Sequence, residues 1–113
     1  MGFPIIKTQN NTYIIQLQKD VTVYQLQDLQ DTIQRLRDKK GNKNVIVDMR
    51  NVSYIDAFAI GALTSLAKEA RENGGDLKIA NMKDEIKTIF ELSHLSRVFD
   101  VYERIEEAEK SFR

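Results

Sequence analysis

The sequence predicts one α/β domain, in which a mixed sheet, mostly parallel after an N-terminal hairpin, packs against about four helices. Helical segments with one apolar stripe alternate with short β-branched runs, which is typical of strand–helix–strand units with parallel strands. The length of 113 residues suits one hydrophobic core without metals or crosslinks. No low-complexity stretch or internal repeat divides the chain, so residues 1–113 are expected to form a single domain.

The first two predicted strands form a hairpin. Residues 12–18 alternate apolar side chains with glutamines, which predicts a half-buried strand. Residues 3–7 are expected to pair with it through the polar turn residues 9–11. Pro4 cannot donate a backbone hydrogen bond, so it favours an edge position for the first strand.

An amphipathic helix is predicted next, because apolar residues recur at positions i, i+3, i+7 and i+10. Asp20 and Thr22 are both plausible N-caps, and the alternative stays open. Tyr24, at the start of the helix, is expected to face the core. The helix is expected to end before Gly41, within a basic stretch. The predicted apolar stripe comprises Leu26, Leu29, Ile33 and Leu36.

The run Val-Ile-Val at residues 45–47 predicts a central strand that is covered on both faces. A loop follows, and a second helix is expected to begin near Phe58 and to end at Gly74 and Gly75. Asp56 occupies the position of an N-cap for this helix.

The last third of the chain predicts a strand at residues 76–80, a helix that opens at Asn81, a strand at residues 98–102 and a short closing helix. The inward residues of the helix after Asn81 are expected to be Ile86, Ile89 and Phe90. The closing helix is expected to bury Ile105, Ala108 and Phe112.

Composition excludes several classes of function. The chain has no cysteine, so disulfides, thiolate nucleophiles and Cys-ligated metals are absent, which suits a cytoplasmic location. Basic and acidic residues number 17 each, so no basic excess points to nucleic acid. No apolar run approaches the roughly 20 residues of a membrane span, and no secretory signal is expected, so direct membrane insertion is not expected either.

Catalytic and cofactor motifs are also missing. His94 is the single histidine, and we expect it at a helix end or turn rather than in a metal or catalytic site. There is no Gly-x-Ser-x-Gly, His-Glu-x-x-His or EF-hand spacing. The turn at residues 56–61 holds one glycine and opens with an acid, which argues against a phosphate cradle. We therefore expect no enzyme activity, no metal and no cofactor.

Two residues of this turn have alternative interpretations. Asp56 could serve as a helix cap, as a partner-facing acid, or as both. Phe58 lies two residues ahead of Ile60 and so away from the centre of the apolar stripe. It is either tucked under the loop or exposed as a binding anchor, and the sequence leaves these two possibilities open.

Three segments resemble the STAS domain, the fold of bacterial anti-sigma factor antagonists. The segment VIVDMRNVSYIDAFAIGAL at residues 45–63 is similar to the family's central motif, in which an apolar strand and a short loop lead to Asp-Ser-Ser-Gly-hydrophobic-Gly. Residues 73–79 resemble the Gly-Gly entry to the next strand, and residues 86–99 resemble a hydrophobic-Lys-x-hydrophobic-Phe pattern. The resemblance covers about residues 12–109 and implies the STAS fold.

The resemblance implies a non-enzymatic regulator that binds an anti-sigma factor or kinase-like protein through residues 56–63 and so releases a sigma factor. In phosphorylated antagonists the second Ser of the motif accepts the phosphate, whereas this chain has Phe58 there, so no phosphorylation is expected at the usual site. The alternative is a structural STAS subunit of a stress-signalling assembly or of a membrane transporter complex, and a homodimer is left open. The expected partner-binding residues are Asp56, Ala57, Phe58, Ala59, Ile60 and Thr64.

Overall fold

The computed structural model describes residues 3–8, 12–37, 44–93 and 99–112. Its main sheet has five strands in the order β1-β2-β4-β6-β7. The first pair is antiparallel and the other three pairs are parallel, which confirms the predicted fold class. The strands are β1 (Ile5–Lys7), β2 (Thr12–Gln16), β4 (Asn44–Asp48), β6 (Asp76–Ala80) and β7 (Asp100–Tyr102).

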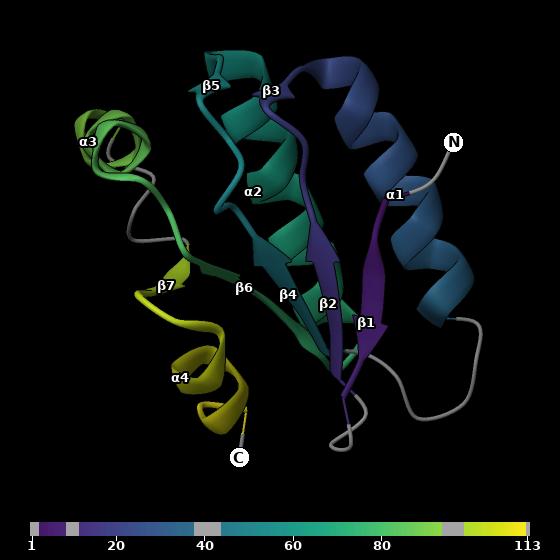
Figure 1. Ribbon diagram of the computed structural model, residues 1–113. Helices are drawn as coiled ribbons and strands as arrows, with labels where there is room; N and C mark the ends of the chain where they lie inside the picture. The colour runs from purple at the N-terminus through teal and green to yellow at the C-terminus, as the bar shows by residue number, and fades with distance from the viewer. Residues whose placement is uncertain (1–2, 9–11, 38–43, 94–98, 113) are drawn as a thin grey trace.

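Helices cover both faces of this sheet (Figure 1). The larger core cluster joins one face of the sheet to the first three helices, and a smaller cluster joins the other face to the last helix. The helices are α1 (Val23–Arg37), α2 (Ala57–Glu72), α3 (Asp84–Leu92) and α4 (Ile105–Lys110).

Strand β4 is central, as the β-branched run predicts. Val45, Ile46 and Val47 are all buried, and the strand pairs with β2 on one side and β6 on the other. The crossover helices α1 and α2 both pack on the face that carries Val45 and Val47, whereas α4 covers the face that carries Ile46.

Strand β2 is buried on both faces, so the prediction of a half-buried strand is wrong. Ile15 packs in the larger cluster, whereas Ile14 on the opposite face belongs to the cluster beneath α4, with Ala108. The alternation with glutamines that predicted a solvated face begins only at Gln16, where the strand ends. The pairing of β1 with β2 is as predicted, and the expected turn at residues 9–11 lies outside the described residues.

A second, two-stranded sheet was not expected from the sequence. It pairs β3 (Asp20–Val21) in parallel with β5 (Tyr54–Ile55). Asp20 therefore lies in a strand, and α1 begins at Val23, which leaves Thr22 as the residue before the helix. The Thr22 backbone N–H donates to Oε1 of Gln25 at 3.4 Å, as in a capping box.

Helix α3 begins later than predicted. Asn81 has a left-handed backbone with φ of 63°, and the helix starts at Asp84 with Lys83 as its N-cap. The Asn81 side chain instead donates to Oδ1 of the buried Asp48 at 3.1 Å. Ile86 and Phe90 are buried as expected, but the expectation for Ile89 is wrong: it is exposed on the outer side of the helix.

The C-terminal strand and helix are present as predicted, but Ile105 and Phe112 are only partly buried, and Phe112 follows the end of α4. Strand β7 pairs in parallel with β6, and α4 closes the described chain with Ala108 fully buried. His94, Gly41 and Val98 lie outside the described residues. Within the described ranges, no helix has the length and apolar character needed to cross a bilayer.

Candidate functional site

Asp56 caps the N-terminus of α2, as one of its two interpretations predicts. Its backbone is extended, and its Oδ1 accepts a hydrogen bond from the Ala59 N–H at 2.8 Å. The Asp56 carbonyl also accepts the first helical bond, from the Ile60 N–H at 3.1 Å. The carboxylate thus satisfies a backbone donor that the helix itself leaves unpaired and fixes the start of α2.

Phe58 points away from the core, and 80% of its surface is exposed. The buried residues of α2 recur every three or four positions from Ala59 onward, which defines the side of the helix that packs on the sheet. Phe58 precedes Ile60 by two residues, or about 200° around an α-helix, so it faces the opposite side. Of the two possibilities that the sequence left open, the structure shows the exposed one.

Two of the expected partner-binding residues are buried. Ala59 is 0% and Ile60 is 2% exposed, so their side chains lie in the core rather than on the surface. They anchor the first turn of α2 to the core instead. Ala57 is exposed, and Thr64 is half-buried with its hydroxyl donating to the Ile60 carbonyl at 2.9 Å.

The two-stranded sheet exposes a further aromatic side chain at the end of the molecule where α2 begins. Side chains alternate along a strand, so Val21 and Ile55 point inward and are buried, whereas Asp20 and Tyr54 point outward. Tyr54 is 52% exposed at the end of the molecule where β3, β5 and the starts of α1 and α2 meet (Figure 1).

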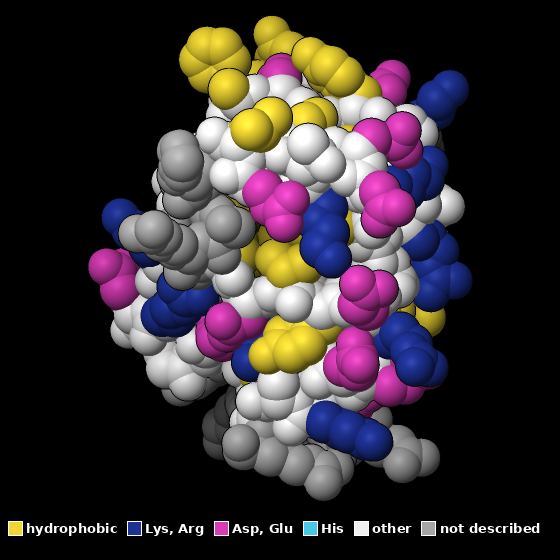
Figure 2. Space-filling view, turned by 90° about the vertical axis from the view of Figure 1, so that its left-hand side faces the viewer, with side chains coloured by type: hydrophobic (Ala, Val, Ile, Leu, Met, Phe, Trp, Pro, Cys, Tyr) yellow, Lys and Arg dark blue, Asp and Glu magenta, His cyan; other side chains and the backbone are white. Residues whose placement is uncertain are grey.

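Tyr24 lies at the same end, in the first turn of α1. It is 76% exposed, so the expectation that it faces the core is wrong. Figure 2 shows hydrophobic side chains gathered at this end of the molecule, at the top of the view. We call the group the apical patch, and it consists of Val23, Tyr24, Tyr54 and Phe58.

Polar groups near the apical patch are engaged locally. The Ser53 hydroxyl accepts a hydrogen bond from Nζ of Lys83 at 3.0 Å, and the Ser65 hydroxyl donates to the Gly61 carbonyl at 3.3 Å. In the part of the chain that the structure describes, no group of three or more His, Cys, Asp or Glu residues could hold a metal ion. The arrangement therefore offers an apolar contact surface with a rigid helical base.

Sequence reasoning found Asp56 and Phe58 but missed Tyr54 as part of the same surface. No periodicity marks Tyr54, because β5 has only two residues and pairs with a strand more than thirty positions away. The exposure of Tyr24 could have been predicted. Tyr24 lies two residues before Leu26, where the apolar stripe of α1 begins, and Phe58 has the same offset from Ile60 and also faces away from the core.

Comparison with known proteins agrees with this architecture. A family model of the STAS domain matches residues 3–108. The anti-sigma-B factor antagonist of Staphylococcus aureus (strain NCTC 8325 / PS 47) is 27% identical over 99 residues, which is 88% of this chain and 91% of that protein.

Solved structures share the fold at low sequence identity. A candidate anti-sigma factor antagonist from Thermotoga maritima superposes with a TM-score of 0.85 at 20% identity, over 98% of this chain and 94% of that one. A chain from the stressosome, described as a signal integration and transduction hub, superposes with a TM-score of 0.70 at 15% identity, over 96% and 95%. Since the family model spans most of the sequence and the mixed, mostly parallel sheet agrees with the expected fold, this chain belongs to the STAS domain family and is related to anti-sigma factor antagonists.

Proposed function

We propose that this protein is an anti-sigma factor antagonist that binds an anti-sigma factor or kinase-like regulator through residues 56–63 of the α2 turn and helix. By occupying the anti-sigma factor, it releases the sigma factor to transcription. The name of the S. aureus relative supports this assignment, since that protein is an anti-sigma-B factor antagonist.

The observation that carries the proposal is the exposure of Phe58 at the first turn of α2. A phenylalanine with 80% of its surface in water contributes little to folding, whereas exposed aromatic residues often dominate the binding energy at the centre of an interface. Asp56 and the buried side of α2 hold it on a rigid helix, so little conformational entropy is lost on binding.

The proposed regulation does not use phosphorylation at the usual position, because Phe58 has no hydroxyl. The nearby hydroxyls of Thr64 and Ser65 donate to helix carbonyls and lie within α2, where the backbone conformation suits a kinase poorly. The protein is then permanently competent to bind, or is controlled by its abundance or by a third protein. We accordingly propose a cytoplasmic, non-enzymatic regulator that needs no cofactor and binds protein rather than nucleic acid.

The experiment is a reconstituted release assay with the anti-sigma factor of the source organism and its sigma factor. The wild-type chain is expected to displace the sigma factor in a concentration-dependent manner without ATP. Phe58→Asp, which places a negative charge at the position that the family resemblance assigns to the phosphorylated serine, is expected to require much higher concentrations. Lys68→Asp, on an exposed position of α2 two turns or more from Phe58, is the matched control for an added acid and is expected to act as the wild type.

A structural STAS subunit remains the contrasting assignment, and the same assay separates the two. Such a subunit fails to displace the sigma factor and co-purifies instead with a large stress-signalling assembly or a membrane transporter. That result would overturn the proposed function.

A further inference from the structure

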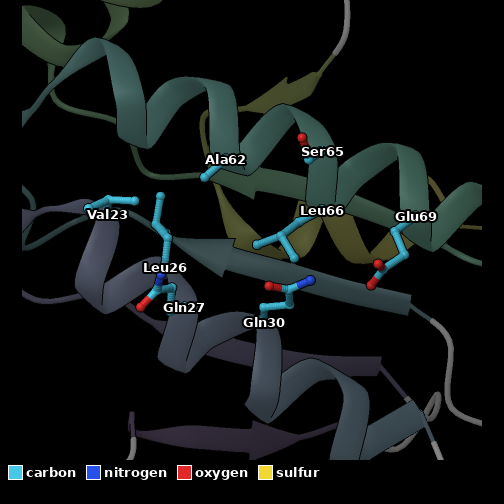
Figure 3. Close-up of a pocket in the computed structure, with 8 residues that line it drawn as sticks. All are labelled: Val23, Leu26, Gln27, Gln30, Ala62, Ser65, Leu66 and Glu69. Carbon is cyan, nitrogen blue, oxygen red and sulfur yellow. The ribbon is translucent and has the colours of Figure 1, made fainter.

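A groove between α1 and α2 adjoins the apical patch and has no role in the function proposed above. Its volume is about 180 Å³. In Figure 3, Leu26 of α1 points toward α2, while Ala62 and Leu66 of α2 point toward α1. The eight lining residues are Val23, Leu26, Gln27, Gln30, Ala62, Ser65, Leu66 and Glu69.

The groove is continuous with the apical patch in two ways. Val23 belongs to both, since it lines the groove and is exposed at the start of α1. Ala62 follows Phe58 by four residues, or about one helical turn, and so lies on the same side of α2. A protein that covers the apical patch therefore also covers Val23, which lines the groove.

Size indicates what the groove can hold. Cofactor and ligand pockets usually enclose about 300–1,000 Å³, which is more than this groove provides. An engineered apolar cavity of about 150 Å³ binds benzene, so a volume of about 180 Å³ accommodates one aromatic or branched aliphatic side chain.

The lining favours an apolar occupant. Leu26 and Leu66 form a floor that is almost fully buried, and Val23 and Ala62 add apolar surface at the mouth. The rim carries neutral amide and hydroxyl groups, and Glu69 is the one charged residue among those that line the groove. A charged side chain placed on this floor would lose its hydration, whereas an apolar one gains from burial.

We propose that the groove receives one leucine, methionine or phenylalanine side chain from the same regulatory protein that docks on the apical patch. This inference rests on the proposed function and adds a second contact to it. The patch supplies protruding aromatic groups to the partner, and the groove accepts a protruding group from the partner. Because the two features lie on one side of α2, their joint use fixes the orientation of the complex, which a single exposed aromatic residue does not.

The test fills the groove by substitution at Ala62 and measures the dissociation constant for the anti-sigma factor. Ala62→Leu occupies the space from within and is expected to weaken binding about tenfold. Lys68→Leu adds the same side chain at an exposed position of α2 that does not line the groove, and it is expected to bind within about twofold of the wild type. Thermal melting of each free variant checks folding, and Ala62→Val replaces Ala62→Leu if the larger side chain lowers the melting temperature.

Methyl NMR of the complex gives an independent readout. Leu26 and Leu66 methyl groups are expected to show intermolecular contacts with an apolar side chain of the partner. Normal binding by the filled variant, together with weakened binding by Phe58→Asp, would overturn the groove proposal and leave the proposed function intact. If Phe58→Asp also binds normally, the docking surface itself is wrong. A wild-type homodimer that Ala62→Leu dissociates would identify a second copy as the occupant and would likewise overturn the proposal.

Discussion

The two ends of α2 are built differently. At the C-terminal end, polar contacts close the helix onto the next strand. The Asn73 side chain donates to the Glu69 carbonyl at 2.8 Å, and Gly74 adopts a left-handed conformation with φ of 85°. Nε of Arg71 lies 2.9 Å from Oδ1 of Asp76 at the start of β6. Interactions within the chain therefore account for how α2 ends.

At the N-terminal end, the chain stabilises the helix with one cap and leaves large apolar surface in water. Asp56 satisfies the Ala59 N–H, and Phe58 and Tyr54 are both exposed at this end of the molecule. Grouped exposed aromatic residues mark interaction surfaces in soluble proteins. Contacts within the chain account for the polar end of α2, whereas we propose that the apolar end serves to bind a partner.

The largest expected change in unfolding free energy distinguishes a buried residue of α2 from an exposed one. Leu63→Ala removes a fully buried side chain from the core and is expected to lower the free energy of unfolding by about 2–5 kcal/mol. Phe58→Ala is expected to change it by no more than about 0.5 kcal/mol. Urea unfolding of both variants measures the difference, and comparable losses would show that Phe58 supports the fold.

Removal of the cap tests the N-terminal end next. Asp56→Ala is expected to lower the free energy of unfolding by about 1 kcal/mol, because the Ala59 N–H loses its acceptor. Asp56→Asn keeps a good capping side chain and is expected to retain most of that stability. If Asp56→Asn is as unstable as Asp56→Ala in thermal melts, the cap is not what Asp56 contributes.

At the C-terminal end, Gly74→Ala is expected to cost about 1 kcal/mol of unfolding free energy, since its positive φ disfavours a side chain. Partner affinity is expected to stay unchanged, because this end carries no part of the proposed interface. Chemical denaturation and calorimetric titration measure the two quantities. Weakened binding by a folded Gly74→Ala variant would contradict the division between the two ends.

The smallest expected change is an increase in the free energy of unfolding, at Gly61. Gly61 lies inside α2 and is exposed, and apart from the adjacent residues and the surrounding helix backbone nothing lies within 4 Å of where a Cβ would be. Gly61→Ala is expected to raise the free energy of unfolding by about 0.4–1 kcal/mol, because alanine restricts the unfolded chain and favours the helix. A lower melting temperature for this variant would indicate that the first turns of α2 pack differently from what the structure shows.

Local patterns predicted the elements that support the site. The β-branched run of residues 45–47 fixed a central strand, and the helical spacing from Ile60 onward placed α2 to within one residue of its observed start. These predictions succeed because a strand buried on both faces has a continuous apolar run, and a helix buried on one side has apolar residues every three or four positions. The same spacing showed that Phe58 lies off the apolar stripe, although it did not show whether Phe58 was exposed.

The apical patch could be predicted only in part, because tertiary contacts assemble it. The short strands β3 and β5 have two residues each and form only with each other, so neither has a detectable period. Asn81 likewise resembles a helix cap in sequence, but its side chain binds the buried Asp48, and α3 begins after it. In both cases a distant partner, rather than a neighbour along the chain, decides the local structure.

The most direct test of the binding role of the apical patch measures affinity and stability on one variant. Phe58→Asp is expected to raise the dissociation constant for the anti-sigma factor about thirtyfold, or about 2 kcal/mol, because the partner must bury a charge in an apolar contact. Its melting temperature is expected to remain close to that of the wild type, since Phe58 makes no part of the core. An unchanged dissociation constant for the folded variant, measured by calorimetric titration, would contradict the account and remove α2 from the interface.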